Sequence, residues 1–175
     1  MTYLSRDINI SDEDCVKYPT EYLNTINIGC LPNHQIVIKE GVPFIIVRTI
    51  SPKLSTGTRC VAKRLYSNII MAEIVNGPHK GEIVTIPRIP LIPSEETNPI
   101  VFKRIQFPIK IAYALTMNRV QSQTFEYVGI DFTRQAFAHG QLYTAISRVT
   151  RPRNLKVYFP EDDFVAKNPV YCEIL

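Results

Sequence analysis

The segment from Thr116 to Thr124 carries side chains that can hydrogen-bond a phosphate. It has the sequence TMNRVQSQT, with hydroxyls and amides on Thr116, Asn118, Gln121, Gln123 and Thr124. Such groups bind phosphate oxygens without selecting a base. The alternative is an ordinary polar turn in which the same side chains cap backbone groups.

A second candidate for phosphate chemistry stands at the end of a predicted helix. The sequence HGQLYTAISRVT is typical of a helix that finishes at Ser147–Arg148. A guanidinium is planar and always charged, so it can contact two phosphate oxygens at once. The other interpretation is that Arg148 complements the negative end of the helix dipole. Arg151 and Arg153 follow the helix and suit either phosphate contacts or a solvated surface.

The elements around these residues are expected to form a parallel α/β layer. KIAYALT is apolar on both faces, as a central parallel strand would be, and YVGIDF and NLKVYF are two further strands. Between the last two, Leu142, Ile146 and Val149 recur at helical spacing. Three strands make a thin sheet, so we expect this layer to be incomplete or to pack against something else.

The chain before this layer has a different periodicity. Residues 35–89 contain five short β-branched runs separated by turn residues, which predict a small antiparallel barrel or meander. Residues 1–33 are expected to be a poorly regular lead-in, with SDED as a turn or helix start and PTEYLNTI as a helical turn. The proline-rich RIPLIPSEETNP predicts a linker near residues 90–100.

Charge and composition narrow the classes of function. The chain has 175 residues and a net charge of +4. Between residues 101 and 160, nine Lys or Arg side chains face only Glu126 and Asp131, which favours a polyanionic partner or a solvated basic face. There is no apolar run of membrane-spanning length and no secretory signal. The four cysteines form no CxxC pair, which predicts reduced thiols, an intracellular protein and no zinc site.

The sequence has no phosphate-binding loop of the G-x-x-x-x-G-K-[ST] type. No two of its glycines are five positions apart. The glycines are Gly29, Gly41, Gly57, Gly77, Gly81, Gly129 and Gly140. INISDED has an apolar–acidic pattern, but without a preceding phosphate loop a solvated acidic turn is favoured over a magnesium site. We therefore expect no metal site.

Five blocks of the sequence, in the same order, resemble the C-terminal part of the Pif (petite integration frequency) family of 5′→3′ DNA helicases, and within it the Helitron helicases. The lead-in YPTEYLNTINIGCLPNHQIVIKEGVPFIIVRTI is similar to the stretch before the family's inserted domain, and TGTR and IPRIPLIPS match "NGTR" and "IPRI.L.PS". RIQFPIKIAYALTMNRVQSQT is similar to "R.QFP..LAFAMTINKSQGQT", and HGQLYTAISRVTRPRNLKV to "HGQLYVALSRV…..LKV".

The resemblance implies an α/β fold with two parts. A partial RecA-like parallel layer (domain 2A) would carry an inserted SH3-like β-barrel (domain 2B). Residues 1–33 would be the lead-in of domain 2A, 34–92 the barrel, and 93–160 the C-terminal part of domain 2A. Residues 161–175 would be an acidic tail.

The resemblance also implies the roles of the candidate residues. Arg148 would be the arginine finger that reaches an ATP γ-phosphate held by the other motor domain, with Gln123 also at the nucleotide. DNA contacts would come from Thr116, Asn118, Arg119, Gln121, Thr124 and Arg153. The sequence departs from the family where "KSQGQT" is RVQSQT, with Arg119, Val120 and Ser122 in place of Lys, Ser and Gly.

Partners, cofactors and location follow from the same resemblance. An intact enzyme would use ATP and Mg²⁺, neither held by this chain alone, and would bind single-stranded DNA together with an N-terminal motor half. DNA repair, recombination, telomere maintenance or Helitron transposition, and a nuclear location, are the expected setting. The alternatives are a stand-alone nucleic-acid-binding or interaction module and an inactive transposon remnant.

Overall fold

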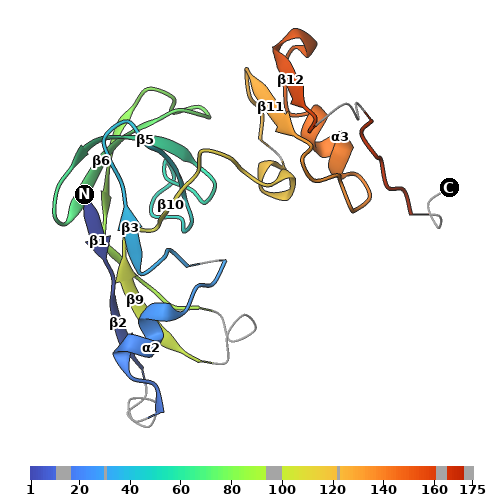
Figure 1. The fold of residues 1–175 in the computed structure, drawn as a ribbon. Helices are drawn as coiled ribbons and strands as arrows, with labels where there is room; N and C mark the ends of the chain where they lie inside the picture. The colour runs from blue at the N-terminus through green and yellow to red at the C-terminus, as the bar shows by residue number, and fades with distance from the viewer. Residues whose placement is uncertain (11–16, 30, 94–99, 122, 161–164, 172–175) are drawn as a thin grey trace. The chain divides into compact units, whose positions relative to one another are not determined.

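The computed structural model describes residues 1–10, 17–29, 31–93, 100–121, 123–160 and 165–171, and for Arg119 the backbone alone. These residues form two compact units, 1–113 and 114–175 (Figure 1). The predicted turn at SDED, the altered Ser122 and part of the predicted acidic tail lie outside the described residues. The domain boundaries expected from the family stay predictions.

Unit 1 is built on a five-stranded antiparallel sheet with the order β10-β4-β5-β6-β7. The strands are Ile109–Ile111 (β10), Pro43–Ile46 (β4), Arg59–Leu65 (β5), Ile69–Ile74 (β6) and Ile83–Pro87 (β7). The last four form the predicted meander. Gly81, at φ +89°, closes the β6–β7 turn, where its N–H donates to the Ile74 carbonyl over 2.8 Å.

Two expectations about these strands are wrong. Ile109–Ile111 pairs antiparallel with β4 at the edge of the sheet, and is not a central parallel strand. The first predicted run forms Gln35–Val37 (β3), which pairs with Thr2–Leu4 (β1) outside the meander. Both errors have one cause, since an apolar run shows that a strand is buried but not which strand it pairs with.

The lead-in is more regular than expected. Besides β1, it contains Arg6–Asn9 (β2) and the predicted helical turn, Thr20–Thr25 (α2). A three-stranded antiparallel sheet joins β2 to Phe102–Gln106 (β9), which in turn pairs with Ile89–Leu91 (β8). The predicted linker thus contains a strand. Its Pro90 is tolerated because β8 lies at the sheet edge.

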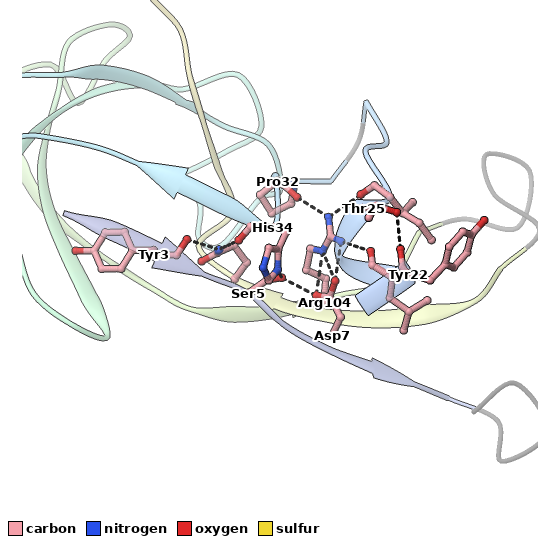
Figure 2. A network of polar contacts seen from close by, with 11 residues as sticks. Tyr3, Ser5, Asp7, Tyr22, Thr25, Pro32, His34 and Arg104 are labelled. Atoms are coloured by element: carbon pink, nitrogen blue, oxygen red, sulfur yellow. Dashed lines mark hydrogen bonds and ion pairs between the residues drawn. The ribbon is translucent and has the colours of Figure 1, made fainter. Parts of the chain in front are cut away.

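A buried arginine joins the lead-in to this sheet (Figure 2). Arg104 of β9 is completely buried, and its Nε and Nη2 donate to the Asp7 carboxylate over 2.7–3.1 Å. Its remaining N–H groups donate to three backbone carbonyls, those of Leu23, Ile26 and Pro32. All five donors are therefore satisfied, and the backbone at Leu23, Ile26 and Pro32 is held against β2 and β9.

Unit 2 contains a parallel β-α-β arrangement. Val128–Asp131 (β11) pairs in parallel with Leu155–Tyr158 (β12), and Gln141–Ile146 (α3) lies between them in the chain. Two short 3₁₀ helices, Met117–Val120 (η1) and Pro152–Asn154 (η2), complete the unit. The core consists of Ile130, Phe132 and Ala145. The parallel pairing of the last two predicted strands, with a helix between them, is thereby confirmed.

Candidate functional site

The polar run forms one turn of 3₁₀ helix followed by an irregular loop. Thr116 precedes η1 with an extended backbone, and Asn118 lies within the turn. Four predicted phosphate-binding side chains are exposed, those of Thr116, Asn118, Gln121 and Thr124. Gln123 is half-buried, and its N–H donates to the Val120 carbonyl over 3.0 Å. The Arg119 side chain lies outside the described part of the chain.

Arg148 lies two residues after the end of α3 and is half-buried. Its Nε donates to the Thr144 carbonyl over 2.9 Å, and its Nη2 to Ser147 Oγ over 2.7 Å. Its Nη1 donates to the Gln123 carbonyl over 3.3 Å. Within the described residues these bonds use three of the five donors and leave one N–H on each Nη atom. A pair of N–H groups is what a bidentate contact with a phosphate requires.

Gln141 is a site residue that the sequence interpretation missed. It begins α3 and is 8% exposed. Its Oε1 accepts from the N–H groups of Phe137 and Ala138 over 3.0 and 3.3 Å. Its Nε2 donates to Asn118 Oδ1 over 3.4 Å. The signal was present, because a glutamine one residue after Gly140 can satisfy backbone donors at a helix start.

Both ends of α3 are thus bonded to the polar run. Gln141 reaches Asn118 at the start of the helix, and Arg148 reaches the Gln123 carbonyl after its end. The loop is also held by backbone bonds, since Phe125 N–H donates to the Arg148 carbonyl over 2.9 Å. The structure therefore brings the two candidate segments, residues 116–124 and Arg148, into one site.

The buried face of α3 differs from the predicted one. Gln141 and Ala145 are buried, whereas Ile146 is 43% exposed. Leu142 is partly buried against the core, as expected. An aromatic ring favours a core position, but Tyr113 and Tyr143 are 72% and 74% exposed. The spacing of apolar residues therefore predicted a buried face of α3 that is one residue away from the face that packs in the structure.

Arg153 lies in η2 and is exposed. Its neighbour Asn154 ties η2 to the loop after the polar run, because its Nδ2 donates to the Glu126 carbonyl over 2.8 Å. Within the described residues the Arg153 side chain makes no hydrogen bond or ion pair. It belongs to the same unit as the other candidates but is not joined to them by its own contacts.

One carboxylate of unit 2 is held in its charged form. Asp131 ends β11, and hydrogen bonds from the side chain and the backbone N–H of Thr133 hold its pKa below the usual range.

Among the described residues no group of three His, Cys, Asp or Glu side chains is arranged to hold a metal ion. No helix in the described ranges is long and apolar enough to cross a membrane.

Comparison with known families identifies part of unit 1. Residues 21–65 match the family described as "DNA helicase Pif1, 2B domain". The chain is 47% identical over 53 residues to the ATP-dependent DNA helicase Pif1 of Campylobacter jejuni, covering 30% of this chain and 12% of that protein. It is 27% identical over 152 residues to PIF1 of Xenopus laevis, covering 84% of this chain and 23% of that protein.

The fold of this chain is also similar to that of solved Pif1 helicase structures. A Bacteroides Pif1 helicase in complex with ADP-AlF3 and single-stranded DNA matches 99% of this chain with a TM-score of 0.67 and 19% identity. Pif1 helicase from Candida albicans matches 96% with a TM-score of 0.67 and 22% identity. The chain spans 38% and 41% of those two chains, so it corresponds to a part of each.

Proposed function

This chain belongs to the Pif1 family of DNA helicases and corresponds to a C-terminal part of such an enzyme, and from that premise we propose that it supplies single-stranded DNA contacts and an arginine finger to an ATP-dependent DNA helicase. The observation that carries the proposal is the placement of Arg148. Its guanidinium is held beside the polar run and retains one N–H on each Nη atom.

Arg148 is the residue to which we assign the nucleotide contact, with Gln123 beside it. In phosphoryl transfer, negative charge develops on the phosphate oxygens. An arginine finger stabilises that charge in the transition state and raises the rate by about 10³–10⁵-fold. ATP would supply the phosphoryl group, and Mg²⁺ would neutralise charge on its oxygens. The sequence has no phosphate-binding loop, so the proposal assigns their binding to an N-terminal motor half.

The DNA contacts are assigned to the exposed side chains of the polar run and to Arg153. Hydroxyls, amides and guanidinium groups bind backbone phosphates without base preference, which suits a motor that moves along any sequence. The exposed residues are Thr116, Asn118, Gln121, Thr124 and Arg153, and Arg119 is added to them because of the family resemblance alone. Residues 114–160 carry six Lys or Arg side chains against Glu126 and Asp131, and this basic excess supports the same assignment.

We assign the finer domain names by the same resemblance. The meander of unit 1 would be the SH3-like barrel 2B, and the β11-α3-β12 arrangement would be the end of the RecA-like domain 2A. A parallel sheet of two strands leaves much of its surface uncovered, and an N-terminal half that adds strands would complete it. A role in repair, recombination, telomere maintenance or transposition, and a nuclear location, belong to this proposal.

Complementation tests the proposal. The chain is fused to, or mixed with, an N-terminal Pif1-family motor half that contains a phosphate-binding loop, and phosphate release is measured with and without single-stranded DNA. We expect DNA-stimulated hydrolysis from the pair and none from this chain alone. A folded chain that binds DNA but never restores hydrolysis would instead support a stand-alone nucleic-acid-binding module.

A further inference from the structure

We propose that Gln141 is a positioning residue that turns the amide of Asn118 so that its N–H groups face outward, toward a nucleic-acid phosphate. The inference rests on the proposed contact between the polar run and single-stranded DNA. It adds a residue that lies in another part of the sequence, 23 positions away, and that does not itself touch the DNA.

The orientation of the Gln141 amide is fixed by its surroundings. Two backbone N–H groups, those of Phe137 and Ala138, point at one end of it over 3.0 and 3.3 Å. Only an oxygen can accept from them, so Oε1 must occupy that end. The Nε2 donors are then directed at Asn118, and because Gln141 is 8% exposed, water competes little for them.

The orientation of Asn118 follows from that of Gln141. A donor at Nε2 requires an acceptor opposite it, so Asn118 presents Oδ1, over 3.4 Å. The oxygen and nitrogen of a planar amide point in different directions, so Nδ2 is turned away from Gln141. Asn118 is exposed, and phosphate oxygens only accept hydrogen bonds. The amide therefore offers a phosphate its two donors and not its acceptor.

Replacing Gln141 with Glu separates this role from simple stability. The carboxylate keeps an acceptor for the Phe137 and Ala138 N–H groups but replaces the donor that faces Asn118 with a second acceptor. Asn118 then turns its Nδ2 inward and presents Oδ1 to the phosphate. Loss of a hydrogen bond to a charged group costs about tenfold in affinity.

Gln135→Glu is the matched control. It adds the same charge to the same unit, and Gln135 also uses both ends of its amide, with Nε2 donating to the Val165 carbonyl and Oε1 accepting from Lys167 N–H, each over 3.0 Å. Binding of the 175-residue chain to fluorescent oligothymidine is measured by anisotropy at low salt. We expect Gln141→Glu to bind about tenfold more weakly than Gln135→Glu, and the difference to vanish in an Asn118→Ala background.

A second measurement follows the Asn118 side-chain NH₂ signals by NMR. We expect them to shift in Gln141→Glu and to stay in place in Gln135→Glu. Equal DNA affinities of the two glutamate variants, while the wild type binds, would overturn the inference. If the wild type binds no DNA, the proposed function fails. The NMR signals then decide the orientation of the Asn118 amide on their own, and signals that do not shift in Gln141→Glu would overturn the inference. Should Gln141→Glu fail to fold, Asn118→Asp is the substitute variant. Its carboxylate places an acceptor toward the phosphate, and position 118 is exposed.

Discussion

Arg148 Nη1 donates to the carbonyl oxygen of Gln123 over 3.3 Å, which joins the end of α3 to the polar run. Gln141 makes the corresponding link to Asn118 at the start of the same helix. Two links at opposite ends of a six-residue helix restrict both its rotation and its translation relative to the run. A displacement of the run on binding DNA would therefore be transmitted to Arg148.

The start of α3 depends on the left-handed backbone of Gly140. Its φ is +75°, and an added Cβ would meet no atom within 4 Å, so the cost of Gly140→Ala is conformational and not steric. We expect a loss of about 1–2 kcal/mol in the free energy of unfolding of unit 2. The control is Gly129→Ala, where φ is not positive and the added Cβ is equally unhindered. Hydrogen exchange of the unit 2 amides measures the stability of both variants. Equal protection in Gly140→Ala and Gly129→Ala would contradict the role of the Gly140 backbone.

Removing Arg104 is expected to unfold the lead-in. Arg104→Met leaves the Asp7 carboxylate buried without its partner, which costs about 3–5 kcal/mol in the free energy of unfolding. Lys63→Met is the control, because the Lys63–Glu73 pair is partly exposed to solvent and its loss costs about 1 kcal/mol or less. The stabilities of the two variants are compared by urea unfolding, monitored through the NMR signals of unit 1. An Arg104→Met chain as stable as Lys63→Met would refute the structural role.

Glu82 gives the β6–β7 turn a pH dependence. Hydrogen bonds from Lys53 Nζ (2.6 Å) and His79 Nδ1 (2.8 Å) hold its pKa below the ordinary value of 4.5. Because the folded-state pKa is lowered, the stabilisation is complete above pH 4.5 and is lost as the pH falls from there through the folded value. We expect Lys53→Ala to raise the pKa of Glu82 in an NMR titration. Lys80→Ala removes the same charge from the β6–β7 turn itself, and should leave the pKa of Glu82 unchanged.

Binding to single-stranded DNA should weaken with salt. The slope of log affinity against log salt concentration is about −0.7 for each phosphate contacted. Arg153→Ala should make the slope shallower by about 0.7 if this exposed side chain contacts one phosphate. Lys53→Ala is the charge-matched control, since Lys53 is already paired with Glu82. A slope that Arg153→Ala leaves unchanged would remove Arg153 from the DNA contacts.

Local signals predicted the elements whose partners are close in sequence. Alternating β-branched residues and turn glycines were enough for β4 to β7, which follow one another in the sheet. The same holds for β11, α3 and β12, where a helix separates two apolar runs. In both cases the pairing follows the order of the chain.

Non-local pairing was beyond the sequence signals. The Arg104–Asp7 pair joins residues 97 positions apart, and nothing near either residue indicates the other. The edge position of β10 likewise depends on β4, more than 60 residues earlier. In the site, the roles of Thr116, Gln121 and Thr124 stay predictions. The sequence indicated that Gln141 could bond backbone donors at the helix start, but its link to Asn118, 23 positions away, comes from the structure.

The central claim is that Arg148 acts on a nucleotide bound elsewhere in an intact motor. The direct measurement is DNA-stimulated ATP hydrolysis by this chain complemented with an N-terminal motor half. Arg148→Ala should lower the rate by about 10³-fold or more, and Arg148→Lys should recover little because an ammonium cannot make the bidentate contact. Arg134→Ala, at an exposed arginine of the same unit, should leave the rate unchanged. An Arg148→Ala pair that hydrolyses ATP as fast as the Arg134→Ala pair would contradict the claim.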